Sequence, residues 1–350
     1  MRRALIGQDN AISRGVFAFR FAMHQHLDPA GQAVDLGLLG GDDIRQVIDR
    51  ADQMGQLFFK VLHHASFCDA VISTEADHRE GEAMTVRVEQ QDRVAVVTID
   101  RPQARNAVNP ATAQALYDAF LALEVDAGTD VIILTGADGA FCAGFDLKTA
   151  ADGSAADWIE AVDIPDDWTD PVGQPMPGPM GPSRLMLSKP VIAAIEGPAV
   201  AGGMELAAWC DMRIMAEGAV MGIYCRRWGV PLIDGGTFRL PRVIGQGRAN
   251  DLILTGRPVD AEEARAMGLA DRLVPQGQAL AAALDLAQTL TRFPQGCMRA
   301  DFLSARMPPA DLAASLRREW ASAAMFAAEG RAGATRFAGG LGRSGRFDDL

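Results

Sequence analysis

Two adjacent glycines stand directly before a carboxylate in the stretch GPAVAGGMEL, residues 197–206. Gly202 and Gly203 precede Glu205, and an apolar run at 190–195 leads into them. A helix that begins at such glycines presents free N–H groups and a partial positive charge, and glycine lets a ligand approach closely. Such N–H groups stabilise an oxyanion, and Glu205, one helical turn along, can transfer a proton beside it. The stretch therefore predicts acid–base chemistry next to a carbonyl, with tight packing as the alternative use of the glycines.

A second glycine-containing turn, AFCAGFDLK at 140–148, follows another apolar run, VIILTG at 131–136. Its backbone at Ala143, Gly144 and Phe145 offers a further N–H group. Two strand ends that each donate one N–H to the same oxygen atom would form an oxyanion hole.

The elements that position these turns are strands alternating with helices. Strands are predicted at 93–100, 131–136, 190–197, 212–218 and 221–225. Asn109 and Pro110 are typical of a helix start, and an apolar stripe follows them. Asp260 and Glu263 form a capping box before a helix that Gly268 ends. This alternation favours an α/β layered fold.

A long segment between two of these strands, 149–183, is irregular and rich in Pro, Gly and Asp. It carries Trp158 and Trp168, so we expect it to pack over apolar side chains and to shape a pocket. Beyond residue 278 the pattern is helical. The apolar stripe of Leu312, Leu316 and Trp320 predicts a core or a subunit contact there.

The first 83 residues differ from the rest, because they hold all five histidines of the chain. The codons for Arg-Glu-Gly-Glu, just before Met84, can form a purine-rich run like a ribosome-binding site. We expect residues 1–83 to be either an extension upstream of a natural start at Met84 or a small helical appendage, with an amphipathic helix at 42–64. The remainder divides into a core, 84–277, and a helical region, 278–350.

The composition excludes several classes of partner. A net charge of −12 and a pI of about 4.9 argue against a basic surface for nucleic acid or for an anionic membrane. No apolar run approaches the roughly 20 residues that cross a bilayer. Five scattered cysteines without a CxxC pair predict neither a disulfide framework nor a metal site. These features favour a cytoplasmic location.

Three stretches, taken in order, carry a family resemblance. They are RVAVVTIDRPQARNAVN (93–109), VIILTGADGAFCAGFDLK (131–148) and PVIAAIEGPAVAGGMELAAWCDMRI (190–214). Together they resemble the crotonase superfamily, the enoyl-CoA hydratases and isomerases. The resemblance runs from about Val86 to Phe337, with further matches at 235–245 and 252–275.

The resemblance implies an α/β spiral of ββα units, a helical C-terminal region for trimerisation, and a homotrimer or a dimer of trimers. It implies an acyl-CoA thioester as substrate, with no cofactor besides the coenzyme A that the substrate carries. The N–H groups of Phe145 and Gly202 would form the oxyanion hole. Lys148 would lie near the CoA nucleotide, and Ala143 and Asp146 would also contact the substrate.

The catalytic acids depart from the usual hydratase pattern of two glutamates. The first glutamate matches Glu205, but the second position holds Cys225, and the family's preceding proline is Tyr224. Asp234 is a candidate substitute acid, or else the cap of a helix beginning near Gly235. Cys225 is interpreted as a small neutral wall of the acyl pocket, the alternative being a nucleophile.

These residues predict an enoyl-CoA hydratase with Glu205 as the general acid/base and Asp234 as a helper. One carboxylate suffices to move a double bond, so an isomerase or another enolate-forming enzyme is the alternative. A non-catalytic acyl-CoA-binding homologue is a third possibility, motivated by Cys225.

Overall fold

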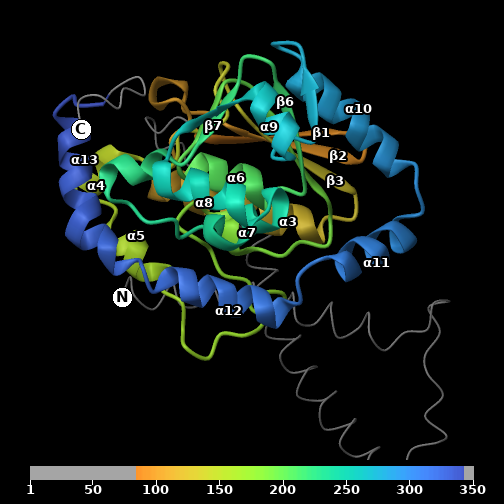
Figure 1. Ribbon diagram of the computed structural model, residues 1–350. Coiled ribbons are helices and arrows are strands. Elements are labelled where there is room, and N and C mark those ends of the chain that lie inside the picture. The colour runs from red at the N-terminus through yellow and green to blue at the C-terminus, as the bar shows by residue number, and fades with distance from the viewer. Residues whose placement is uncertain (1–83, 343–350) are drawn as a thin grey trace, which may run out of the picture. The chain divides into compact units, whose positions relative to one another are not determined.

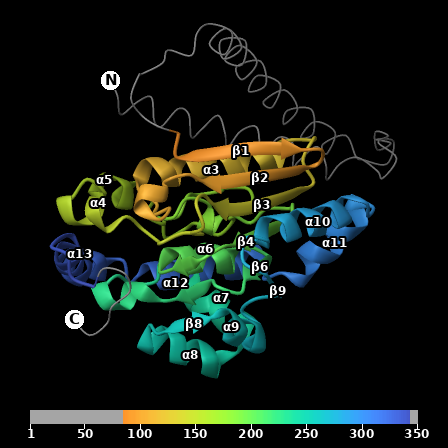
Figure 2. The same cartoon turned by 90° about the horizontal axis from the view of Figure 1, so that it is seen from above.

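Residues 84–342 are described by the computed structural model of the chain. The predictions for residues 1–83, including the helix at 42–64, lie outside the described residues. The described strands and helices are arranged as layers around two sheets (Figures 1 and 2).

The larger sheet has six strands in the order β1-β2-β3-β4-β6-β9. Its strands are β1 (Val86–Gln91), β2 (Val94–Ile99), β3 (Val131–Gly136), β4 (Val191–Ile195), β6 (Met212–Ala216) and β9 (Arg272–Val274). Only β1 and β2 pair antiparallel; every other neighbouring pair is parallel. A second sheet of three strands has the order β5-β7-β8, formed by β5 (Pro198–Val200), β7 (Val220–Gly222) and β8 (Pro258–Asp260).

The two sheets are built from a repeated unit. β4 in the larger sheet is followed by β5 in the smaller sheet and then by helix α6 (Gly202–Trp209). β6 and β7 repeat this step, and a bridge between Cys142 and Ala199 gives the chain after β3 the same course. This arrangement confirms the predicted ββα spiral, and β5 adds a short strand between the predicted 190–197 strand and the glycines.

The remaining helices cover the sheets and end the chain. They are α3 (Pro110–Val125), α4 (Leu147–Asp152), α5 (Ala156–Ala161), α7 (Gly236–Ile244), α8 (Gln246–Thr255), α9 (Ala261–Met267), α10 (Ala279–Thr291), α11 (Gln295–Ala305), α12 (Pro309–Trp320) and α13 (Arg331–Ala338). Both predicted caps are present: the Asn109 side chain accepts from Thr112 N, and the Asp260 side chain accepts from Glu263 N. α10 packs on β2, β3, β4 and β6, and α13 packs beside α4 (Figure 1).

The predicted strand at 221–225 is wrong beyond its second residue. β7 ends at Gly222, and Tyr224–Trp228 form a 3₁₀ helix. Pairing with β8 stops where Gly222 meets Pro258, and proline has no N–H with which to continue the ladder. Cys225 therefore lies on a helical turn and not on a strand.

The long segment 149–183 packs over apolar side chains, as predicted, but it is not wholly irregular, because it contains α5 and most of α4. Trp158 packs against the main core and donates its Nε1–H to Pro179 O at 3.1 Å. Trp168 is buried in a second apolar cluster with Leu312 and Leu316 of α12. The C-terminal stripe is therefore part of the core of this same chain.

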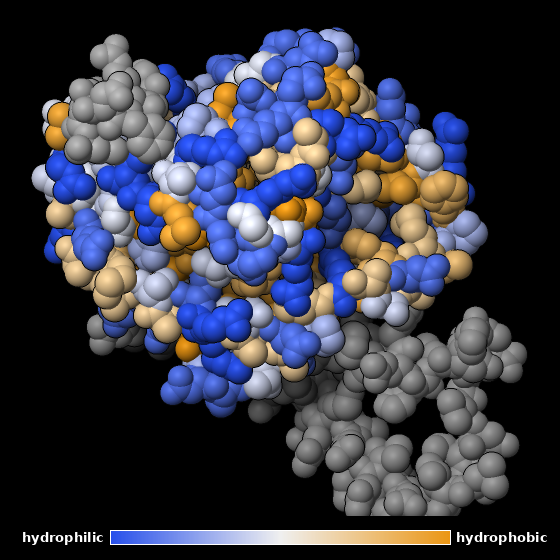
Figure 3. Space-filling view, viewed as in Figure 1, coloured by the Kyte–Doolittle hydropathy of each residue, from blue (hydrophilic) through white to orange (hydrophobic). Residues whose placement is uncertain are grey.

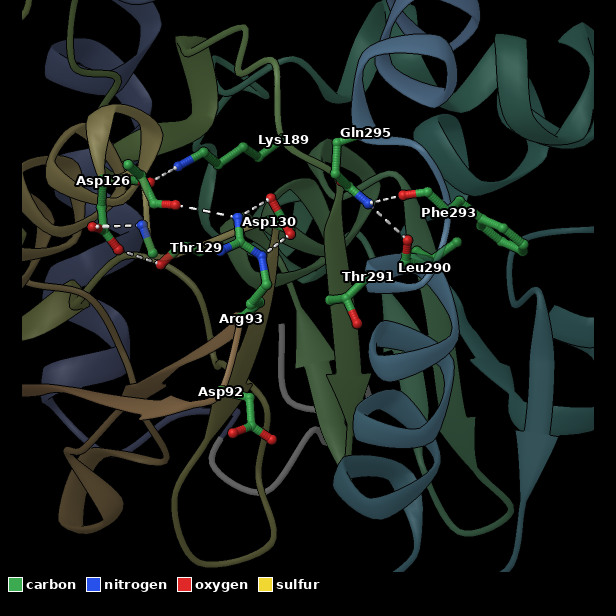
Figure 4. A network of polar contacts seen from close by, with 12 residues as sticks. Asp92, Arg93, Asp126, Thr129, Asp130, Lys189, Leu290, Thr291, Phe293 and Gln295 are labelled. Atoms are coloured by element: carbon green, nitrogen blue, oxygen red, sulfur yellow. Dashed lines mark hydrogen bonds and ion pairs between the residues drawn. The ribbon is translucent and has the colours of Figure 1, made fainter.

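Charged side chains hold the beginnings of the parallel strands. Arg93, before β2, pairs with Asp130, before β3, and Arg299 of α11 binds the same carboxylate at 2.9 Å. Lys189, before β4, donates to main-chain carbonyls at the end of α3, among them that of Asp126 (Figure 4). These contacts fix one end of the sheet and leave the loops at the carboxyl ends of the strands to form a site.

On the face shown in Figure 3, hydrophilic and hydrophobic residues are interspersed. Among residues 84–342, no helix combines the length and apolar character needed to cross a bilayer.

Candidate active site

The two glycine-containing turns meet. Cys142 N donates to Pro198 O at 3.0 Å, and Val200 N donates to Cys142 O at 3.0 Å. Gly144 has φ +93°, and a Cβ placed on it would lie 2.9 Å from Gly202 N. Only glycine fits there, because the backbone is left-handed and the neighbouring turn is in contact.

The N–H groups of Phe145 and Gly202 have no hydrogen-bond partner among residues 84–342. Val108 N donates to Gly144 O and Asp146 N donates to Val108 O, at 2.8 and 2.9 Å. Since successive N–H groups of an extended chain point to opposite sides, this pairing turns the N–H of Phe145 away from Val108. Gly202 is the first residue of α6, where the helix leaves the N–H without an internal acceptor.

All eight residues that the sequence predicted line one cavity of about 710 Å³. They are Ala143, Phe145, Asp146, Lys148, Gly202, Glu205, Cys225 and Asp234. The structure therefore places the two free N–H groups and both candidate acids around a common space.

Glu205 is buried in the first turn of α6, and one of its oxygens is fixed. Oε1 accepts hydrogen bonds from Asp234 N at 3.0 Å and from Gly236 N at 2.9 Å. No hydrogen bond to Oε2 is formed within the described residues. Burial, reinforced by the nearby charges of Asp234 and Glu319, raises the pKa of Glu205 well above its ordinary value. The side chain can therefore hold a proton at a higher pH than an exposed glutamate can.

Asp234 is also buried, but its carboxylate already accepts hydrogen bonds from other residues of the protein. Oδ1 accepts from Met180 N at 3.0 Å and from the Ser183 hydroxyl. Burial raises its pKa, against these hydrogen bonds. The alternative cap role is wrong: Gly235 is the cap residue of α7, and no side chain at that position bonds to the helix.

Cys225 lies 5% exposed at the cavity wall. Burial, together with the charge of Glu205, raises the pKa of its thiol to about 12. The thiol is therefore neutral at physiological pH, which fits the predicted neutral wall and removes the basis for a nucleophile, since the thiolate is the reactive form.

The Asp146 carboxylate has partners within the protein. It caps α4 by accepting from Lys148 N at 3.1 Å and pairs with Arg101 at 3.0 Å. Arg101 and Arg105, which the sequence reasoning did not single out, line the cavity together with Lys148. These three side chains give one part of the cavity wall a positive charge suited to phosphate.

Sequence reasoning also missed the contribution of the C-terminal helices. Phe326 and Phe337 line the cavity, and Phe326 stacks edge-on against Phe145 with ring centroids 6.3 Å apart. Glu319 of α12 accepts from Gly235 N at 2.6 Å, next to the residues that bind Glu205. No local pattern marks these residues, because they follow the rest of the site by 80 residues or more.

Within the described part of the chain, no group of three or more His, Cys, Asp or Glu residues is placed to hold a metal ion. Four cationic side chains of residues 84–342 line the cavity, those of Arg101, Arg105, Lys148 and Arg227, and these are the groups suited to an anionic ligand.

Two free N–H donors beside a protonatable buried carboxyl group define a class of enzyme that stabilises an oxyanion while it moves a proton. The sequence model of the enoyl-CoA hydratase/isomerase family matches residues 89–177 and 183–325. The chain therefore belongs to the enoyl-CoA hydratase/isomerase family and has the crotonase fold, and it is an enzyme of that family.

Other proteins are similar to this chain in both sequence and structure. An enoyl-CoA hydratase of Mycobacterium tuberculosis is 38% identical over 211 residues, which is 58% of this chain and 73% of that protein. A carnitinyl-CoA dehydratase of Salmonella arizonae is 36% identical over 213 residues, 59% of this chain and 75% of that protein. A crystal structure of an enoyl-CoA hydratase from Mycobacterium avium aligns with a TM-score of 0.58 at 34% identity, covering 71% of this chain and 99% of that one.

Proposed function

We propose that the chain adds water to the double bond of a 2-enoyl-CoA, and catalyses the reverse elimination, with Glu205 as the acid/base. The observation that carries the proposal is the pair of free N–H groups, at Phe145 and Gly202, in the same cavity as a carboxyl group that can hold a proton. Several relatives are named as enoyl-CoA hydratases.

The thioester oxygen would sit between the two N–H groups. As the oxygen of water bonds to C3, the C2=C3 electron pair shifts toward the thioester, and the charge on its oxygen is stabilised by the N–H of Phe145 and of Gly202. Glu205 gives its proton to C2 and takes one proton from the attacking water. Glu205 ends as it began, and the product carries H at C2 and OH at C3.

The CoA moiety would be held where Ala143 and the cations Lys148, Arg101 and Arg105 line the cavity. We propose no cofactor beyond this CoA, because the thioester itself makes the C2 proton acidic. Cys225 would then contact the acyl group. Its position and neutral thiol leave Asp234 as the cavity acid whose charge acts on Glu205.

Isomerisation of a 3-enoyl-CoA is the second candidate, favoured by the neutral thiol of Cys225 where a second acid would otherwise stand. The two reactions need opposite forms of Glu205. Hydration through one carboxyl group starts from the protonated form, whereas isomerisation starts when the carboxylate removes a proton from C2.

The test compares the wild type with Glu205→Gln on a short 2-enoyl-CoA and a short 3-enoyl-CoA across a pH series. Glutamine keeps an oxygen for the two N–H groups but moves no proton. For hydration we expect kcat to fall about 100-fold or more in the variant, and the wild-type rate to fall as pH rises through the raised pKa. A rate that rises with pH, on the 3-enoyl-CoA only, would replace hydration by isomerisation. Equal inactivity of both proteins, with CoA esters still bound, would indicate a binding protein.

We also propose that the chain assembles as a homotrimer or a dimer of trimers. The proposal is supported by α11, which buries none of its residues within the described chain. Phe293, just before this helix, and Leu303, within it, are both exposed. A contact with a second copy would cover these side chains.

A further inference from the structure

Four successive N–H groups at the start of α7 are shared by two buried carboxyl groups. Asp234 N and Gly236 N donate to Glu205, as described above. The two alternate N–H groups donate to Glu319 of α12: Gly235 N to Oε2 at 2.6 Å, and Thr237 N to Oε1 at 2.9 Å. The turn 234–237 is thus held from two sides, by one carboxyl group from each of two helices.

We propose that Glu319 is a positioning residue for Glu205, which fixes the turn 234–237 so that its other two N–H groups hold the catalytic carboxyl group in place. The inference rests on the proposed role of Glu205 as acid/base. It gives the C-terminal helical region a part in the reaction, exerted through the main chain of a turn and not through contact with the substrate.

The geometry leaves Glu319 little freedom. Its side chain is buried, and Oε1 also accepts from the Thr237 hydroxyl at 2.7 Å. Gly235 has φ +97°, a left-handed conformation that favours glycine at this position of the turn. A carboxylate that accepts two N–H groups at a helix start is also favoured by the helix dipole.

α12 is itself anchored to the segment that covers the site. Trp320 Nε1 donates to the Asp163 carboxylate at 2.6 Å, and Leu316 packs with Trp168. Arg317 donates to the carbonyl of Trp168. A displacement of α12 would therefore shift Glu319 and, through its hydrogen bonds, the turn 234–237.

The charges around Glu205 set the direction of the pH effect. Asp234 and Glu319 raise its pKa, while the partly buried guanidinium group of Arg239 faces all three carboxyl groups and Arg184 faces Asp234 and Glu319. Cys225 is the remaining titratable neighbour, and its thiol is neutral. Removing the charge of Glu319 therefore lowers the pKa of Glu205, because one of the two negative neighbours is gone.

The experiment uses Glu319→Gln in the full chain. Glutamine keeps the size of the side chain but turns an amide NH₂ toward one of the two N–H groups, leaving that donor without an acceptor. We expect kcat to fall about 10- to 100-fold, KM to stay within about threefold, and the pH limb assigned to Glu205 to move to lower pH. Asp311→Asn is the matched control, because it makes the same change on an exposed residue of α12 and should leave both kcat and the pH profile unchanged.

A graded variant is Thr237→Val, which removes only the hydroxyl donor to Glu319 and keeps both N–H donors, so we expect a smaller fall in kcat than in Glu319→Gln. A Glu319→Gln enzyme with a wild-type kcat and pH profile would overturn the proposal, and so would a purely thermal effect, a lower Tm with unchanged kinetics. If the wild type itself turns over no enoyl-CoA, the proposed reaction fails separately. The pKa of Glu205, followed by infrared difference spectra against Glu205→Gln, then tests the positioning role: an unchanged pKa in Glu319→Gln would overturn it.

Discussion

At the scale of the residue, Glu205 meets two requirements that usually conflict. Its Oε1 is fixed by two N–H groups, which favours the ionised form, while burial beside two other carboxyl groups favours the neutral form. Burial is the stronger effect and raises the pKa. The side chain is therefore both held in one orientation and able to keep a proton, which a general acid/base needs.

Cys225 provides a test of how the site differs from a two-acid hydratase. Because its thiol is neutral and buried, we expect Cys225→Ala to leave kcat on an enoyl-CoA within about threefold of the wild type. Steady-state rates, with a search for a covalent acyl-enzyme by mass spectrometry, provide the measurement. A loss of about 100-fold, together with a trapped thioester in the wild type, would contradict this and make Cys225 a nucleophile.

The sequence predicts some of the site residues and not others, for a physical reason. The two glycine-containing turns and Glu205 predict chemistry at an oxyanion, and the family resemblance identifies Phe145 and Gly202 as the donors. Glu319 lies 84 residues from the Gly235 N–H that it accepts, and a glutamate in an amphipathic helix is ordinarily a solvated residue. Only the packing of α12 gives it a partner, so no local pattern identifies it.

At the scale of the element, the oxyanion hole depends on the contact between two turns. A Cβ at Gly144 would meet Gly202 N at 2.9 Å and Ala201 Cβ at 2.8 Å, so Gly144→Ala must push the turns apart. We expect kcat to fall about 100-fold or more, as when one oxyanion donor is lost. Steady-state kinetics of the Gly144→Ala protein measure the loss of kcat, and its urea unfolding measures any loss of stability.

Gly139→Ala is the matched control for this change. Gly139 also has a positive φ, +73°, but a Cβ there has no atom within 4 Å. It should therefore lose about 1 kcal/mol of unfolding free energy from backbone strain and keep its kcat. If both alanine variants lose activity equally, strain in the 137–146 loop is responsible, and the contact with Gly202 is not.

The elements themselves were predictable to different degrees. Apolar runs with clear caps, such as the one that follows Asn109 or Asp260, fold as the sequence predicts, because the capping bond is local. The run 221–225 did not, because its strand ends where a partner strand presents Pro258. Pairing between distant segments is a tertiary property that local propensity does not contain.

At the scale of the whole molecule, the ion pairs at the strand beginnings and the carboxyl groups of the site lie at opposite ends of the sheet. Ion pairs such as Arg93–Asp130 and Arg306–Asp211 lie at the beginnings of the parallel strands, whereas the three buried carboxyl groups of the site gather at the opposite, carboxyl ends. Glu205, Asp234 and Glu319 all have pKa values raised by burial. Ionisation of these three carboxyl groups therefore opposes folding.

This arrangement predicts how the free energy of unfolding depends on pH. A carboxyl group whose pKa is higher in the folded state than in the unfolded chain binds more protons when folded. Its contribution to stability is fully present below the unfolded pKa, about 4.3 for a glutamate, and is lost as pH rises toward the folded pKa. Glutamine at position 205 has no proton to lose. We therefore expect Glu205→Gln to gain stability relative to the wild type as pH rises from about 4.5 to 8, by at most about 1.4 kcal/mol per pH unit. Urea unfolding of both proteins across that range measures the difference, and two parallel curves would mean that Glu205 is ionised as readily in the folded protein as in the unfolded chain.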